Sequence, residues 1–491
     1  MNKYKIWILL LAIWNVILFY GNSWGISVLL FIIPLLVYLY FLMKDNKLIN
    51  NKKGLLLMIP IILLSLTYFI FNNEGFKIFN FIVIIGLIAL MYAITIKNTF
   101  KFLKLVENFF SSLFEPIVYL DKFFYSIFPK KEKRINKLKL SDKTKRILIS
   151  ILIALPVIII VLALLSSADM IFGKIFDKFF SLFTFNINFK IDSLGDIIGR
   201  IIRFFIVFCL LGSSMVYLKE KYYLNDKEEI IKEEKNKDLL SLKILFISLN
   251  IIYIIFDFIQ IKSLMLHSIS MSGITYAEYA RQGFFQLMVV SLINLSIILI
   301  SKRFENKNNK KEFNLIKIMS VIMLLLTIVI VVSSFLRMNL YEQAYGYTTL
   351  RLLVYIALIT EFILMIPTLL YIFNSKYNIV KSYMIIIIIV YVLTNYMNID
   401  YMIARRNIDR YYETKKIDLN YLRNYGTDNV KLLIELYNNL NTSDEKRELN
   451  DYLYDIGKDN KTDNIFEYNL SKDIAVKEIK KVKLDKPEFY R

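Results

Sequence analysis

A glutamate in the middle of a long apolar run has the clearest chemical potential in this sequence. Glu361 lies at the centre of residues 349–373, and a carboxylate at that depth in a bilayer is costly unless it faces other helices or water. Asn250 and Asn294 lie at a similar depth in two other apolar runs. Such a set can move protons or ions, or it can join helices through hydrogen bonds to a protonated glutamate. The sequence leaves both interpretations open.

A second set of charged residues lies within about two helical turns of one end of its apolar runs. These residues include Arg203, Asp257 and Arg351. Arg351 is ten residues from Glu361, or about 15 Å along a helix, so we predict Asp257 to be the better partner for an arginine. A buried structural ion pair, or arginines that reach the interface, would explain the set without any further role.

Two short segments between apolar runs are unusually rich in polar and aromatic residues. We expect both to be turns on the same side of a membrane. Their distinctive side chains are Tyr276, Glu278, Arg281, Glu342, Tyr345 and Gly346. Tyrosines are typical of the aromatic belt at a membrane interface. The added acids, arginine and glycine favour two turns that pack together or line one outward cavity.

The elements that position these residues are apolar runs long enough to cross a bilayer. Hydrophobic residues make up 56% of the 491 residues, which predicts an all-α polytopic membrane protein with about eleven spans. The expected spans are residues 6–20, 25–43, 54–71, 77–96, 147–165, 197–218, 241–262, 283–301, 315–336, 349–373 and 382–398. The first is short, and its loss would reverse the predicted side of the amino terminus.

The distribution of cations predicts the orientation. One set of alternate connections holds 32 lysines and arginines, whereas the opposite connections hold five. Because connections rich in lysine and arginine stay in the cytoplasm, we expect a multi-pass cell-membrane protein with a cytoplasmic amino terminus and an extracytoplasmic carboxy terminus. This pattern also explains the net charge of +20 without nucleic-acid binding.

The chain divides into four predicted parts, with interfacial segments between spans. Residues 102–128 and 171–183 show helical stripes that predict helices lying in the membrane plane. Residues 130–146 are rich in cations and suit anionic lipid headgroups, although a solvated topology-setting loop is an equal alternative. The parts are a four-helix segment (1–96), a cytoplasmic amphipathic helix and basic loop (97–146), a seven-helix membrane domain (147–398) and a helical extracytoplasmic domain (399–491).

Several classes of chemistry are disfavoured by the composition. The single histidine, His267, excludes a multi-histidine metal site, and the single cysteine, Cys209, excludes an intramolecular disulfide framework. No glycine-rich phosphate loop, nucleophile elbow or zinc-protease motif is present. We therefore expect no cofactor and no metal, and we favour a protein without enzymatic activity.

Four segments together resemble an uncharacterised bacterial family of polytopic membrane proteins, known only as a domain of unknown function. They are Ser-Ser-Ala-Asp at 166–169, the turns at 276–284 and 345–351, and residues 400–410. The resemblance runs from about 147 to 440 and leaves the first four spans outside. It implies membrane location and a bacterial source, and it gives no residue a catalytic role. It also suggests that the turns and residues 400–410 form one assembly.

Three functions fit these observations. The leading hypothesis is a non-enzymatic envelope protein that senses or scaffolds through its outer turns and carboxy-terminal helices. The alternative is a secondary transporter or channel with a polar midplane site around Glu361. A weaker third is an enzyme on a lipid-linked substrate that uses Glu278, Glu342 or Asp400 at the outer face.

Overall fold

The computed structural model describes residues 2–97, 119–127, 193–224, 239–261, 284–302 and 310–486, with gaps at 375, 416, 424, 441–442 and 460–463 and a few further positions between 108 and 116. Within these residues the regular elements are all helices. They form two compact units, one made of residues 1–20 and 110–225 and the other of residues 21–109 and 226–491. The predicted division into four parts remains a prediction.

The first unit is built around one long helix. Helix α9 (Ser193–Leu224) packs against α1 (Asn2–Phe19) and α6 (Leu120–Ile127). Gly212 of α9 allows the approach of α6, because a Cβ at this position would lie 2.0 Å from Cζ of the fully buried Phe123. About half of the expected in-plane helix at 102–128, and all of the one at 171–183, lies outside the described residues.

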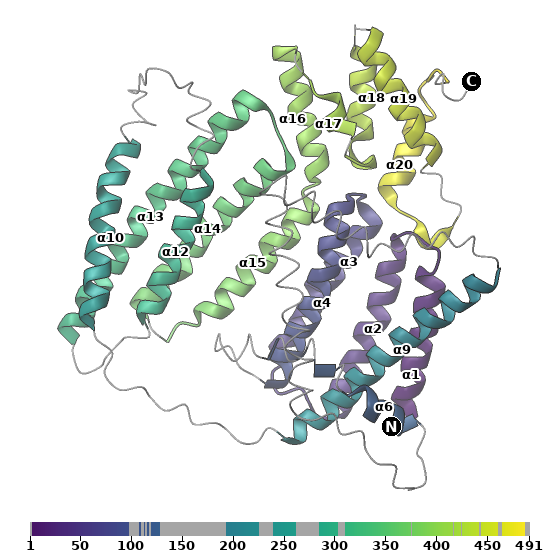
Figure 1. Ribbon diagram of the computed structural model, residues 1–491, viewed down its shortest axis with the longest axis horizontal. Helices are drawn as coiled ribbons and strands as arrows, with labels where there is room; N and C mark the ends of the chain where they lie inside the picture. The colour runs from purple at the N-terminus through teal and green to yellow at the C-terminus, as the bar shows by residue number, and fades with distance from the viewer. Residues whose placement is uncertain are drawn as a thin grey trace, which may run out of the picture. The chain divides into compact units, whose positions relative to one another are not determined.

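The second unit contains the remaining long apolar helices, which lie side by side (Figure 1). They are α2 (Ile26–Asp45), η1 (Lys52–Leu57), α3 (Met58–Ile70), α4 (Glu74–Lys97), α10 (Leu239–Gln260), α12 (Phe284–Ser301), α13 (Lys310–Tyr345), α14 (Thr349–Phe373) and α15 (Ile379–Tyr396).

The faces of α10 show the arrangement expected in a bilayer. Asn250 and Asp257 are 6% and 4% exposed, whereas Ile255 and Phe258 are 58% and 70% exposed. A helix that buries its polar side chains and exposes its large apolar ones suits a lipid environment. Seven described helices are long and apolar enough to cross a membrane, and two shorter apolar helices accompany them.

Each expected span except residues 147–165, which lie outside the described residues, coincides with a helix. The total of eleven spans remains a prediction. One boundary differs clearly: α13 continues to Tyr345, nine residues beyond the expected end of the span at 336, so the turn before α14 consists only of residues 346–348. Residues 340–345 contain neither glycine nor proline, and the helix therefore continues until Gly346, which has φ +82°.

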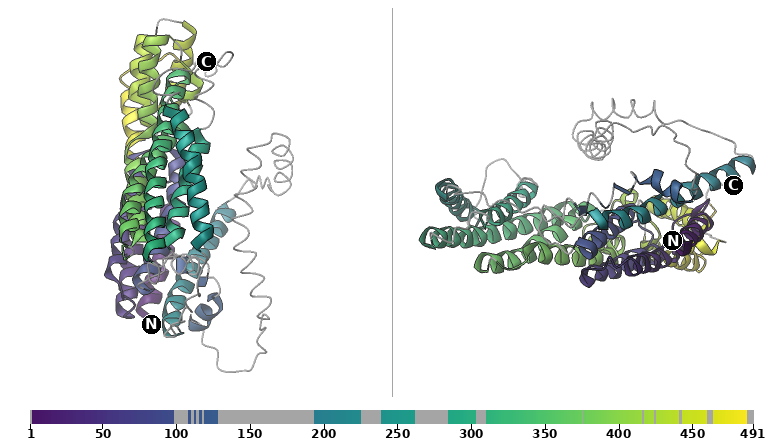
Figure 2. Two further views of the ribbon diagram at one scale, coloured as in Figure 1. Left: turned by 90° about the vertical axis from the view of Figure 1, so that its left-hand side faces the viewer. Right: turned by 90° about the horizontal axis from the view of Figure 1, so that it is seen from below.

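The carboxy-terminal helices form a compact group beyond one end of the apolar helices of the second unit, which we call the cap (Figures 1 and 2). Leu433, Leu436 and Leu453 are fully buried at its centre, and each contributes about 2 kcal/mol through burial. Around this centre, α18 (Val430–Asn439) packs against α19 (Ser443–Asp459). The cap contains α16 (Ile399–Thr414), α17 (Leu419–Arg423), η4 (Thr427–Asn429), α18 (Val430–Asn439), α19 (Ser443–Asp459), η5 (Ile465–Glu467) and α20 (Leu470–Ile479).

Helix α20 anchors the cap to α2 and α3, which the sequence pattern does not predict. Asn469 donates from Nδ2 to the carbonyl oxygens of Tyr68 and Phe71, both at 2.8 Å. The N–H of Ile26 donates to the carbonyl oxygen of Tyr468 at 3.0 Å. The two Asn469 bonds satisfy carbonyl oxygens at the end of α3, which a helix end leaves without intrahelical partners.

Candidate functional site

Polar side chains from α10, α12, α13 and α14 meet inside the apolar helices of the second unit. We call Tyr253, Ser291, Asn294, Thr327 and Glu361 the polar row. Ser291 donates from Oγ to Oε2 of Glu361, and both residues are buried. Asn294, one turn further along α12, donates to Thr327 Oγ1 at 3.0 Å and accepts from the Tyr253 hydroxyl at 2.8 Å. The row therefore links four helices through hydrogen bonds.

The structure thus brings Glu361 and Asn294 into one group, because Glu361 bonds to Ser291 on the helix that carries Asn294. Asn250 does not belong to this group. Asn250 donates from Nδ2 to the carbonyl oxygen of Met319 at 3.1 Å, and its own Oδ1 is buried without a hydrogen-bond partner among the described residues. Ser291, Thr327 and Tyr253 were not predicted to belong to the site. Small hydroxyl residues give little signal in an apolar run, because each can also bond to its own helix backbone.

Asp257 was predicted to pair with an arginine, and Arg351, the candidate arginine in the same unit, does not bond to it. Both carboxylate oxygens of Asp257 are buried, and no donor reaches them from the described part of the chain. Arg351 donates from Nη1 to the carbonyl oxygen of Gly346, and its guanidinium lies 4.2 Å from the centre of the Tyr341 ring. Arg351 therefore contacts residues of its own turn and not Asp257. Arg203 belongs to the first unit, where its Nε donates to Asn15 Oδ1 at 3.0 Å.

The turn between α13 and α14 is clamped by α16. Asn407 accepts at Oδ1 from the N–H of Tyr347 at 3.0 Å and donates from Nδ2 to the carbonyl oxygen of the same residue at 2.9 Å. Gly346 fits beneath this clamp, because a Cβ would lie 2.9 Å from Nη1 of Arg410 and 3.0 Å from Oδ1 of Asn407. Residues 400–410 and this turn are therefore in direct contact, which is one part of the assembly that the family resemblance suggests.

The acid and the tyrosine predicted at this turn, Glu342 and Tyr345, have different environments. Glu342 is 5% exposed and accepts at Oε2 from the hydroxyl of Tyr355 at 2.9 Å. Tyr345 is 48% exposed, and its ring lies 5.1 Å from that of Tyr341. The matching turn with Tyr276, Glu278 and Arg281 lies outside the described residues, so the predicted pairing of the two turns remains a prediction.

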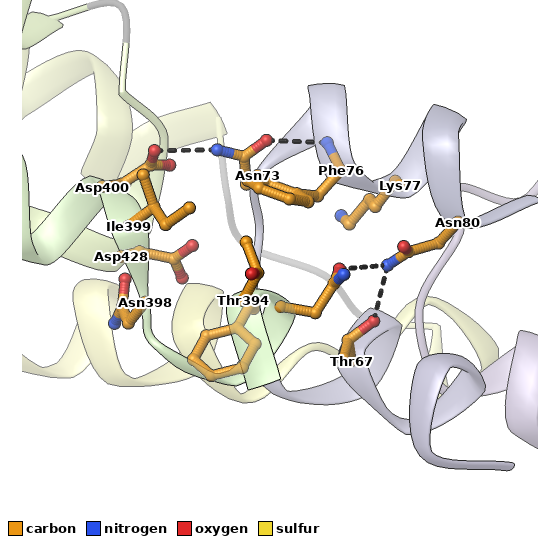
Figure 3. A pocket seen from close by; sticks show the side chains of 12 residues that line it. Thr67, Asn73, Phe76, Lys77, Asn80, Thr394, Asn398, Ile399, Asp400 and Asp428 are labelled. Atoms are coloured by element: carbon orange, nitrogen blue, oxygen red, sulfur yellow. Dashed lines mark hydrogen bonds between the residues drawn. The ribbon is translucent and has the colours of Figure 1, made fainter. Parts of the chain in front are cut away.

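A pocket lies where the cap meets α3, α4 and α15, and we call it the junction pocket (Figure 3). Asn73 donates from Nδ2 to Oδ1 of Asp400 at 2.7 Å. Both carboxylate oxygens of Asp428 accept from the backbone N–H of Asn72 at 3.0 Å. Lys77 reaches the same region and donates to Asn72 Oδ1 at 2.6 Å. Two acids and one amine from distant parts of the chain therefore share a buried site.

An amide ladder closes the side of the pocket toward the apolar helices. Asn80 donates from Nδ2 to Thr67 Oγ1 at 3.0 Å and to Asn395 Oδ1 at 2.7 Å, and it accepts from the Tyr391 hydroxyl at 2.8 Å. These bonds connect α3, α4 and α15. Of the pocket residues, sequence reasoning had considered only Asp400, as a possible catalytic acid. The hydrogen-bond partner of Asp400, Asn73, lies 327 residues away in sequence, so spacing cannot reveal it.

Burial controls the ionisation of the two acids. Desolvation raises the pKa of Asp400 to about 7, the nearby Asp428 adds to this effect, and the Asn73 amide opposes it. The pKa of Asp428 is also raised by burial, against the opposing effects of the Ser471 hydroxyl, the Asn72 N–H and Lys77. Asp400 therefore titrates close to neutral pH, an uncommon property that often marks functional sites.

The described residues contain no group of three or more histidine, cysteine, aspartate or glutamate side chains that could hold a metal ion. Chemistry at the junction pocket therefore rests on two carboxylates, one ammonium, and neutral amide and hydroxyl groups. Such a set can bind a proton, a hard cation or water, because oxygen ligands suit these species.

In the described part of the chain, seven helices of spanning length, with apolar faces outside and polar groups inside, define a membrane-embedded helical protein. Its residues 58–436 match the family model described as Domain of unknown function (DUF4153), and the chain belongs to this family. No curated protein and no solved structure matches it. The match begins at Met58, so most of the third predicted span and all of the fourth lie inside it. This corrects the expectation that the first four spans lie outside the family region.

Proposed function

We propose that this chain is a non-enzymatic protein of the bacterial inner membrane, and that its cap forms an extracytoplasmic surface for sensing or scaffolding. The amino terminus is cytoplasmic in this proposal, in line with the unequal distribution of lysine and arginine. Residues 130–146 lie outside the described residues; in this proposal they face the inner leaflet and bind anionic lipid headgroups. The proposal rests mainly on how the cap is attached.

The cap is bound to the ends of several apolar helices at once. Asn469 bonds to the end of α3, Asp400 to the start of α4, and Asn407 to the turn before α14. In addition, the hydroxyl of Tyr421 accepts from the N–H of Thr349 at 3.0 Å. A flexible tether would not need such contacts. A partner that binds the cap therefore acts directly on the ends of α3, α4 and α14.

One face of α16 has the side chains that dominate protein interfaces. Tyr401 and Tyr412 are each 40% exposed, and the side chain of Arg405 is 48% exposed. Their spacing of four and seven residues places them on one face. Tyrosine and arginine are enriched among the residues that contribute most to binding. Tyr412 lies about 16 Å along the helix from Tyr401, further than an aromatic belt at the membrane surface would extend.

The test replaces Tyr401, Arg405 and Tyr412 together by alanine and asks whether the variant complements a strain that lacks the chain. A control variant carries Lys477→Ala in α20 and Lys481→Ala just after it, where both side chains are exposed. We expect the α16 variant to lose complementation while it stays inserted at normal abundance, and the control to retain it. Full complementation by the α16 variant would refute the proposed surface.

Transport is a second candidate, because Asp257 carries two buried carboxylate oxygens without a donor in the described part of the chain. Intramembrane acids of this kind often lie on ion pathways. The polar row favours packing instead, since Glu361 and Asn294 already have partners in neighbouring helices. Access of water to Glu361 separates the two functions, and loss of flux in Glu361→Gln at normal expression would support transport.

A further inference from the structure

The junction pocket contains one negative charge that its own residues do not balance. Asp400 and Asp428 are both carboxylates, and Lys77 supplies the single ammonium among the lining residues. Figure 3 shows the two carboxylates on one side of the pocket and the Lys77 side chain opposite them. Asp400 is 2% exposed, and a buried charge without a counter-charge is costly. The site is therefore favourable for one positive charge.

One carboxylate oxygen is available for that charge. Asn73 donates to Oδ1 of Asp400, whereas no donor from the described residues bonds to Oδ2. Asp400 lines the pocket together with the oxygen-bearing side chains of Thr394, Asn395 and Asn398. Hard monovalent cations bind to carboxylate, amide, hydroxyl and carbonyl oxygens, and the ends of interrupted helices commonly supply them in membrane proteins.

The size of the pocket limits what can occupy it. The centre of a water-sized sphere can move within about 20 Å³, and roughly 10–15 Å³ on this measure is enough for one water molecule. An ion of similar size fits, whereas an amino acid or a sugar does not. The interruption between α15 and α16 also lies here, because Asn398 adopts φ 47° between the two helices.

We propose that the junction pocket binds one small monovalent cation, Na⁺ or an ion of similar size, in competition with a proton on Asp400. Bound there, the ion neutralises the excess charge and joins α16 and η4 of the cap to the start of α4. The charged or titratable groups that act electrostatically on or with Asp400 are Asp428, Tyr425 and Tyr452. Those that act on Lys77 are Lys472, Asp428 and Glu74.

The experiment uses the purified full-length chain in detergent. Thermal unfolding is followed at pH 8 while NaCl replaces choline chloride at constant ionic strength, and binding of ²²Na⁺ is measured directly by a scintillation proximity assay. We expect a saturable rise of the unfolding midpoint and saturable ²²Na⁺ binding. Both effects should fade at pH 5, because Asp400 is then protonated. Equal midpoints in NaCl and choline chloride, without ²²Na⁺ binding, would show that the pocket holds water only.

Two variants test whether the ion binds at this pocket. Asp400→Asn should abolish the sodium response, whereas Asp409→Asn, an exposed carboxylate on the same helix, should retain it. Lys77→Gln removes the competing ammonium and should lower the half-saturating NaCl concentration by about tenfold, as expected for one nearby charge. If Asp400→Asn does not fold, Lys77→Gln still decides, since an unchanged or higher half-saturating concentration contradicts the site. Cation binding can be measured whether or not the cap has an envelope partner.

Discussion

Replacing Asn407 by alanine should loosen the cap from the turn between α13 and α14. The amide makes two hydrogen bonds to the backbone of Tyr347, at 3.0 and 2.9 Å. A typical protein hydrogen bond contributes about 0.5–1.5 kcal/mol to stability, so the loss is about 1–3 kcal/mol. This corresponds to an increase of about 5- to 150-fold in the population with the cap detached from this turn.

Hydrogen exchange on the full-length chain measures this population directly. Amides of α16 and of residues 346–352 should exchange faster in Asn407→Ala by that factor, because local opening exposes them. The matched control is Asn439→Ala, which removes one exposed bond to the Tyr412 hydroxyl at 3.2 Å and should change little. Equal exchange in the two variants would show that the Asn407 amide does not hold the cap on this turn.

Three further predictions follow from the described contacts. Gly346→Ala should lower the free energy of unfolding by about 1–3 kcal/mol, and by more than Gly21→Ala, which shares a positive φ but has open space at its Cβ; similar unfolding midpoints would contradict this. With Cys209→Ser as background, Glu361→Cys should resist membrane-impermeant thiol reagents from both sides, because Glu361 is 4% exposed, and labelling from either side would favour transport. In sodium-free buffer, the raised pKa of Asp400, about 7 against 3.8, stabilises the fold below pH 4, and this stabilisation is lost as the pH rises through 7. The free energy of unfolding of Asp400→Asn should therefore depend less steeply on pH between 5 and 8 than that of the unsubstituted protein. An unchanged slope would show that other groups cause the pH dependence.

The apolar periodicity of each helix predicts the features that depend on that helix alone, such as the depth of a residue in the membrane. The position of Glu361 at mid-span, and its level relative to Asn294, follow from counting residues along apolar runs. The structure then adds Ser291, which bonds Glu361 to the helix that carries Asn294. Arg351 could not be placed in this way, because its partners lie nearby in the chain: it bonds to the carbonyl oxygen of Gly346 and stacks on the Tyr341 ring.

The junction pocket could not be predicted in the same way. Asp400 and Asn73 are 327 residues apart, and Asp428 and Asn72 are 356 residues apart. Each residue on its own resembles an ordinary capping or surface group. Only the docking of the cap on α3 and α4 turns these residues into a buried cluster, and docking depends on shape complementarity that one sequence does not reveal. Asn469, which bonds to the end of α3, escaped prediction for the same reason.

The connection between α15 and α16 gives the cap a mechanical property. Only Met397 and Asn398 separate the two helices, and both belong to their helix caps. With sixteen residues, α16 is a rod of about 24 Å, so a tilt of about 5° at its base displaces its far end by about 2 Å. The two helices thus have the geometry of a lever. A small change in the tilt of α15 within the membrane would move the far end of α16 by a distance comparable to the length of a hydrogen bond.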